Sequence, residues 1–192
     1  MIKLLKGKEY PAERIILKEN DSIPTARPTE DLVERIINTL DNSGDDLRNF
    51  ASKLLIKIAR EKEILQGLFF LFDGKSTLNF LSGYACNKEN IENTSFELGE
   101  GLPGQVAHDR KLINLRNVPN GYILIQTGLG QASPNSLIVF PVNHEDKLLG
   151  VIELASFQTF TDDDETLFIE LSKKIGEQLS WFLNIESSRN GK

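Results

Sequence analysis

Cysteine is almost absent from this chain of 192 residues, because Cys86 is its single cysteine. One thiol excludes an internal disulfide and a thiolate metal cluster within one chain, and it suits a reducing compartment. We therefore expect a cytoplasmic protein. Histidine is also scarce. Neither His108 nor His144 has another histidine, a cysteine or an acidic pair at ligand spacing, so we expect no metal, haem or other cofactor.

A surplus of basic residues is missing as well. The formal net charge is −6 at pH 7 and the sequence shows no basic stripe, so neither a nucleic-acid backbone nor an anionic membrane surface would be attracted. No window approaches the roughly 20 apolar residues that span a bilayer, and the N-terminus has no apolar run of signal-peptide length. We expect a soluble chain with no nucleic acid and no direct membrane contact among its partners.

What is present is an ordinary globular composition, with 40% hydrophobic and 26% charged residues. The length predicts one sizeable domain rather than two. Residues 1–28 contain three prolines and no sustained periodicity, and we interpret them as an N-terminal extension or linker. The domain itself is expected over residues 29–186, and residues 187–192 are interpreted as a C-terminal tail.

Three segments have the apolar spacing of amphipathic helices, namely residues 29–40, 47–61 and 161–185. The last begins with Thr161, which is expected to form a reciprocal cap with Asp164. Its apolar side is broader than one seam on a sheet requires. We therefore expect a homodimer through the terminal helices.

Six segments are predicted as strands: Ile64–Phe72, Thr77–Ala85, Phe96–Leu98, Leu112–Leu115, Leu137–Val142 and Leu148–Ser156. The first is apolar on both alternating faces, which is typical of a strand covered on both sides and predicts a central position in the sheet. Residues 102–109 are predicted as a short helix. Residues 116–135 are rich in glycine, asparagine and proline and too long for an ordinary connection, so we interpret them as a functional loop.

The segment Phe96–Ala107 joins a strand to a short helix through three glycines and a proline, and the two apolar strands joined by the polar turn 143–147 follow downstream. In this order the segments resemble the GAF domain family, over roughly residues 45–186. The segments 118–125, 128–130 and 154–157 further resemble GAF modules of bacterial sensor histidine kinases. The resemblance implies an α+β, GAF/PAS-like fold: an antiparallel β-sheet of about six strands, a helical bundle on one face, and short helices and loops that roof a pocket on the other.

By that resemblance, the ligand-binding residues would be Phe96, Leu102, Gly104, Gln105, Val106, Asn114, Tyr122, Ile125, Leu129 and Glu153. The alternative is that they are ordinary core and loop residues, as aliphatic side chains usually are. Glu153 differs because it interrupts an apolar strand, and burial of an unpaired carboxylate costs several kcal/mol. It must therefore be paired, lie at an edge, or face a wet cavity. Tyr122 and Gln105 would offer a hydroxyl and an amide to a small polar ligand.

The resemblance implies a signal-sensing or regulatory domain that binds an unknown small molecule and relays a conformational change through its flanking helices. The sequence contains no kinase motif. The catalytic output would therefore belong to another domain or protein, such as a histidine kinase of a two-component system. One alternative is a ligand-free dimerisation module. Another is a GAF-type methionine sulfoxide reductase, but that chemistry needs a resolving thiol besides the attacking one, and Cys86 is alone. We therefore expect no enzyme. The residue set of the cyclic-nucleotide subgroup and a bilin motif are also missing.

Overall fold

The computed structural model describes residues 29–38, 46–87, 91–119, 123–127 and 130–190. The described helices are α1 (Thr29–Asn38), α2 (Leu47–Lys62), α4 (Gly101–Asp109) and α5 (Asp162–Asn190). The strands are β1 (Gln66–Phe72), β2 (Thr77–Tyr84), β3 (Ser95–Glu97), β4 (Ile113–Arg116), β5 (Ile125–Thr127), β6 (Gly130–Ala132), β7 (Ser136–His144) and β8 (Lys147–Ser156). No helix within these ranges is long and apolar enough to cross a membrane.

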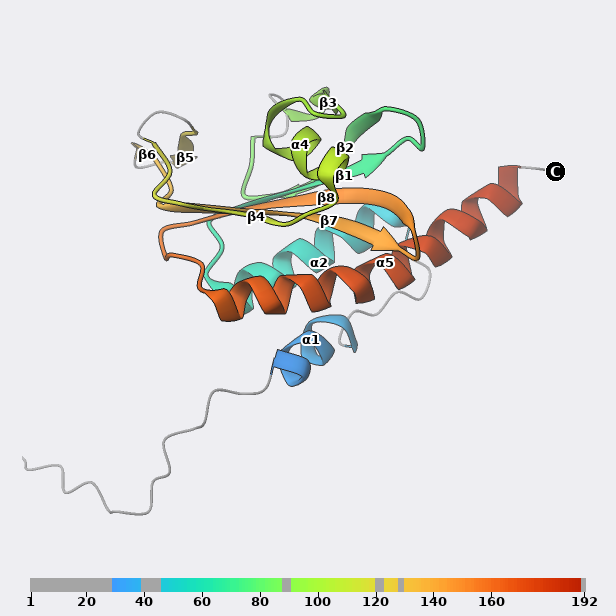
Figure 1. The fold of residues 1–192 in the computed structure, drawn as a ribbon, viewed down its shortest axis with the longest axis horizontal. Helices are drawn as coiled ribbons and strands as arrows, with labels where there is room; N and C mark the ends of the chain where they lie inside the picture. Colours follow the sequence, from blue (N-terminus) through green and yellow to red (C-terminus); the bar gives the residue numbers. More distant parts are fainter. Residues whose placement is uncertain (1–28, 39–45, 88–90, 120–122, 128–129, 191–192) are drawn as a thin grey trace, which may run out of the picture.

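Six of the strands form one antiparallel sheet in the order β3-β2-β1-β8-β7-β4. Helices α2 and α5 cover one face of this sheet, which we call the helix face (Figure 1). Helix α4 lies over the opposite face, which we call the roof face, and α1 packs on the outer side of α5. The predicted α+β fold is confirmed, including the central place of the first predicted strand.

The six predicted strands and the helices at 47–61, 102–109 and 161–185 are found with ends shifted by a few residues. The first predicted helix is described as far as Asn38, and its expected end at Leu40 lies outside the described residues. The segment 116–135 differs from the prediction, because it contains the hairpin of β5 and β6. Strands of three residues carry little periodicity, and β5 and β6 also lie within a segment rich in glycine and polar residues.

Short polar interactions fix where the elements begin. The Asp46 side chain accepts a hydrogen bond from the Asn49 backbone N–H at 2.7 Å and caps α2. Before α5, the Thr161 backbone N–H donates to Asp164 and the Asp164 N–H donates back to the Thr161 hydroxyl, which is the predicted reciprocal cap. In the turn between β1 and β2, Asp73 Oδ1 accepts three backbone N–H groups.

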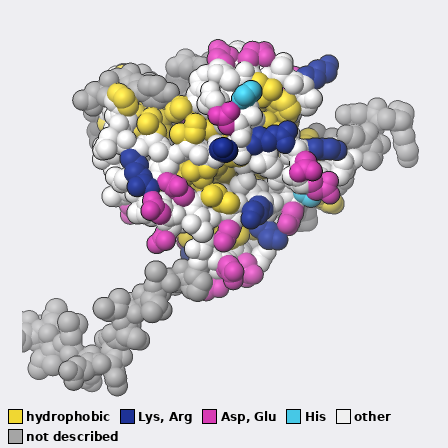
Figure 2. Space-filling view, viewed as in Figure 1, with side chains coloured by type: hydrophobic (Ala, Val, Ile, Leu, Met, Phe, Trp, Pro, Cys, Tyr) yellow, Lys and Arg dark blue, Asp and Glu magenta, His cyan; other side chains and the backbone are white. Residues whose placement is uncertain are grey.

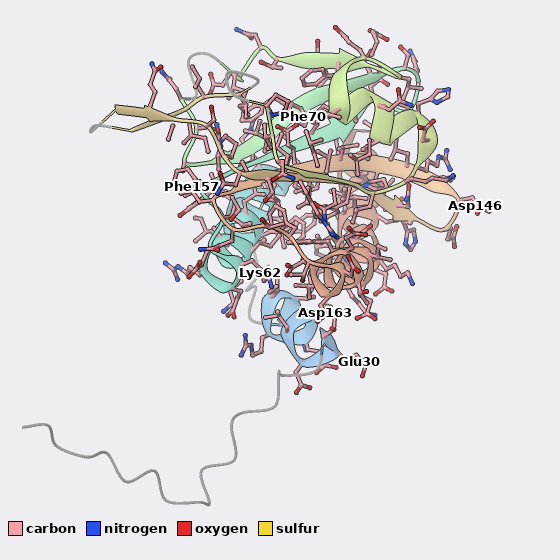
Figure 3. All side chains as sticks on the ribbon, turned by 60° about the vertical axis from the view of Figure 1, so that its left-hand side comes forward. Glu30, Lys62, Phe70, Asp146, Phe157 and Asp163 are labelled. Atoms are coloured by element: carbon pink, nitrogen blue, oxygen red, sulfur yellow. The ribbon has the colours of Figure 1, made fainter. Side chains whose placement is uncertain are left out.

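The helix face carries the main core. Phe69 of β1, Phe140 of β7 and Ile152 of β8 are fully buried there against α2 and α5. The rings of Phe140 and Phe168 stack with centroids 5.2 Å apart. Figure 3 shows the separation of the two layers, with Phe70 on the side of α4 and Lys62 on the side of α2 and α5. The roof face carries two smaller apolar clusters instead of one.

Candidate functional site

Glu153 lies on the roof face in the interior of the sheet. Along β8, Ile152 and Leu154 belong to the helix-face core, so the intervening Glu153 side chain is on the other face. Its strand is bordered by β1 and β7, where its partners in register are Leu68 and Val139. The carboxylate is therefore not at an edge, which removes one of the three explanations for an acid in this apolar strand.

The surroundings of Glu153 are apolar on both sides. Towards one end of β8, Val151 belongs to a cluster that includes Val106 of α4. Towards the other end, Ala155 belongs to a cluster that includes Ile125 of β5. Leu102 contacts both clusters. Glu153 thus sits between two apolar patches, beneath the elements that form the roof.

Burial raises the pKa of Glu153 from 4.5 to about 7. Among the described residues, no hydrogen bond or ion pair reaches its carboxyl group. The neighbours on the same face of the adjoining strands, such as Leu68 and Val139, do not ionise. The carboxyl group therefore loses its proton at a higher pH than an ordinary glutamate does, and in its protonated form it can donate as well as accept a hydrogen bond.

Gln66 is a second polar side chain on the roof face. It pairs in register with Ala155, and Leu68 and Phe70 follow it at the alternating positions of β1. Its Oε1 atom is buried and accepts no hydrogen bond within the described part of the chain. Gln66 is the diagonal cross-strand neighbour of Glu153, a relation that places Cβ atoms roughly 7–8 Å apart, within reach of long side chains. The two therefore offer unused acceptors in one region.

Gln66 was not among the site residues predicted from the sequence. The signal was available, because its position has the same parity as Leu68 and Phe70 in an apolar run. A polar residue there must face the same side as those two side chains.

Within the described ranges, no group of three His, Cys, Asp or Glu residues has the geometry of a metal site.

Four of the predicted site residues surround this region or lie next to it. Leu102, Val106 and Ile125 belong to the two roof-face clusters, and Val106 is fully buried. Phe96 lies farther out, on the edge strand β3, with its ring centroid 5.3 Å from that of Phe70 in an edge-to-face contact. These side chains provide apolar surface.

Three other predicted residues have different contacts. Asn114 is on the helix face, where its Nδ2 donates to the Phe160 carbonyl and to Glu165 of α5. Gln105 donates to Asp109 on the exposed side of α4. A Cβ atom at Gly104 would lie 2.2 Å from the backbone oxygen of Glu97, so this glycine permits close packing of α4. Tyr122 and Leu129 lie outside the described residues.

The comparison with protein families agrees with this geometry. The model of the GAF domain matches residues 45–179. The chain belongs to the GAF domain family. No curated protein matches this GAF domain.

Solved structures share the fold at low sequence identity. The GAF domain of an Acinetobacter phosphoenolpyruvate-protein phosphotransferase has a TM-score of 0.70 and 20% identity, and the match covers 85% of this chain and 99% of that one. A putative GAF sensor protein from Burkholderia vietnamiensis has a TM-score of 0.59 and 24% identity, covering 78% and 91% of the two chains. The free methionine-R-sulfoxide reductase of Neisseria meningitidis, solved with its substrate, has a TM-score of 0.63 and 17% identity, covering 82% and 91%. Identities this low establish the fold, and the fold is shared by enzymes and other GAF proteins.

Proposed function

We propose that this GAF domain is a sensor that binds a small molecule on the roof face of its sheet, at Glu153. The observation that carries the proposal is the carboxyl group of Glu153, which is partly buried in the middle of an apolar strand and has no partner among the described residues. Buried polar groups in folded proteins nearly always have partners, and an exception requires an explanation. A bound ligand supplies that partner.

The chemistry of the site favours a ligand that donates hydrogen bonds. Gln66 Oε1 is an acceptor, and the Glu153 carboxyl accepts in both of its protonation states. An ammonium or hydroxyl group next to apolar carbon fits these acceptors and the surrounding Leu102 and Ile125 side chains. A cationic group also stabilises ionised Glu153 and lowers its pKa.

Few contacts separate a ligand at Glu153 from the terminal helix α5. Glu153 faces the roof, whereas its neighbours Ile152 and Leu154 belong to the core beneath α2 and α5. The next strand, β7, is tied to α5 by the Ser172 hydroxyl, which donates to the Pro141 carbonyl at 2.6 Å. We propose that α5 transmits the ligand-bound state to an output domain, such as a histidine kinase.

The test is native mass spectrometry of freshly purified protein, followed by a thermal-shift screen with amine and polyol metabolites. A ligand at a hundred times its Kd stabilises the folded protein by roughly 2.7 kcal/mol. Glu153→Gln should reduce that stabilisation, while Glu92→Gln, which removes an exposed carboxylate, should leave it unchanged. Identical ligand binding by the Glu153→Gln and parent proteins would contradict the proposal.

We also propose that the domain is not an enzyme and forms a homodimer. The absence of a second cysteine argues against the reductase chemistry of some relatives, because no resolving thiol is available beside Cys86. The dimer is favoured by Trp181, whose side chain on α5 is 55% exposed. Light scattering at tens of micromolar, roughly the range of weak interfaces, should report a dimer that Trp181→Ser disrupts. A parent protein that stays monomeric contradicts this part of the proposal.

A further inference from the structure

A groove of about 770 Å³ lies beside β7, between the segment after α4 and helix α5. Glu153 does not line it. The groove is lined by the segment after α4, by the second half of β7 and by one side of α5. The groove residues are Arg110, Lys111, Leu112, Phe140, Pro141, Asn143, His144, Glu145, Glu165, Ile169, Ser172, Lys173 and Glu177. Its volume is within the range of small-molecule sites.

The groove exists because β4 covers only part of the neighbouring strand. Pairing between β4 and β7 ends at Ile113 and Val139, so the rest of β7 has no strand beside it on that edge. Helix α5 fastens this uncovered part through the hydrogen bond between Ser172 and Pro141. It also approaches closely at Gly176, where a Cβ atom would lie 1.9 Å from the Asn143 backbone oxygen. The groove is therefore held between fixed elements.

Three cations and three carboxylates line the groove, and the cations are the less engaged of the two groups. Among the described residues, Arg110, Lys111 and Lys173 form no ion pair within the salt-bridge distance, although Arg110 donates to the Asp146 carbonyl. Two of the three carboxylates already have ion pairs, because Glu165 pairs with Arg116 and Glu177 pairs with Lys174. Glu145 has no ion pair among the described residues. Figure 2 shows Lys and Arg together with Asp and Glu side chains around apolar side chains in this part of the surface.

An unsatisfied polar group adds a directional contact. Asn143 lines the groove, and its Oδ1 atom is buried and has no hydrogen-bond partner within the described part of the chain. Rotation of the amide by half a turn exchanges its oxygen and nitrogen, so the same position serves a ligand acceptor or a ligand donor. Apolar surface comes from Leu112 and from Ile169, which is 48% exposed. This combination of apolar surface and a few polar groups is typical of a ligand site.

We propose that this groove is a second binding site, which takes a small phosphate- or carboxylate-bearing molecule with an apolar part. The anionic group binds Arg110, Lys111 and Lys173, and the apolar part lies on Leu112 and Ile169. Because α5 forms one wall, an anion there binds directly to the helix through which the roof-face site is proposed to signal. Ligands at the two sites would thus both affect α5, one through the sheet and the other by direct contact.

The test uses the full chain labelled with ¹⁵N and titrated with phenyl phosphate, phenylacetate and the neutral phenol. Both anions, or one of them, should shift the amide signals of residues 110–112, 143–145 and 169–177, and added salt should weaken the effect. The response to one anion and not the other distinguishes a phosphate from a carboxylate ligand. Phenol should bind at least roughly tenfold more weakly than the preferred anion.

Matched variants locate the site. Lys111→Gln with Lys173→Gln should weaken anion binding at least roughly tenfold, whereas Arg60→Gln with Lys75→Gln removes the same charge outside the groove and should change it less than about twofold. Glu153→Gln should leave anion binding unchanged, which separates this proposal from the roof-face site. The proposal is overturned if neither anion shifts groove signals, if phenol binds equally well, or if the groove variant binds like its control. Shifts that depend on protein concentration without any probe would also overturn it, because the groove would then be an interface between copies.

Discussion

The two faces of the sheet differ in the kind of polar group that lacks a partner. On the helix face, the Asn114 Nδ2 atom donates two hydrogen bonds to the α5 region and Ser172 donates to a buried carbonyl, but the Asn114 Oδ1 atom has no partner among the described residues. On the roof face, the Gln66 Oε1 atom also lacks a partner, and Glu153 adds an ionisable carboxyl group whose pKa is raised by burial. An unpaired carboxylate costs more stability than an unpaired amide oxygen, so the roof face loses more stability in exchange for binding capacity.

Truncation of the helix-face core should have the largest effect. Phe69 is completely buried between β1 and the helices, so Phe69→Ala should lower the free energy of unfolding by about 3–5 kcal/mol. Phe96→Ala, on the roof face at the edge strand, removes a partly exposed ring and should cost clearly less. Urea unfolding followed by circular dichroism measures both. Equal losses would show that the roof face contributes as much packing as the helix face.

Glu153→Gln should stabilise the protein above neutral pH. Burial raises the pKa of Glu153 in the folded protein to about 7, whereas the unfolded chain keeps the ordinary value of 4.5. Between these two values the unfolded chain has already lost the proton and the folded protein still holds it. The folded parent protein therefore loses stability as pH rises from about 4.5 to about 7. The difference between 4.5 and about 7 corresponds to about 3 kcal/mol at roughly 1.4 kcal/mol per unit.

The gain from Glu153→Gln should therefore be near its full value at about pH 8 and absent at about pH 4, where the carboxyl is protonated in both states. Unfolding curves of the two proteins across this range provide the measurement. A stability difference that does not vary with pH would mean that the Glu153 carboxyl titrates normally, and the contrast between the faces would lose its main support.

Asn114→Leu should destabilise the protein by about 2 kcal/mol, because one of its two hydrogen bonds is made to the Glu165 carboxylate. The replacement also leaves the Phe160 carbonyl without its donor. Thermal unfolding should show a lower Tm, with no change in the binding of any roof-face ligand. Loss of ligand binding without loss of stability would instead assign Asn114 to the site that the sequence predicted.

The fold was predictable because its signals are local. Alternating or continuous apolar residues mark the strands, and the cap of Thr161 and Asp164 marks the start of α5. Glu153 was singled out because a carboxylate in an apolar strand stands out, and its role in ligand binding stays a prediction. The contacts of Asn114 and Gln105 were not predictable, because a short strand or helix presents two sides and the sequence does not say which side meets the roof. Gln66 needed the register between β1 and β8, which depends on contacts far apart in the sequence.

Gln66→Leu should have the smallest effect and the opposite sign to Asn114→Leu. Leucine removes a buried oxygen that makes no hydrogen bond and adds apolar surface next to Ala155, so we expect a gain of about 1 kcal/mol in the free energy of unfolding. Gln66→Glu is the informative second variant, because a second carboxyl diagonal to Glu153 should destabilise the protein as pH rises. A loss of stability in Gln66→Leu would mean that the amide is satisfied in solution, and Glu153 would then be the remaining unpaired polar group of the proposed roof-face site.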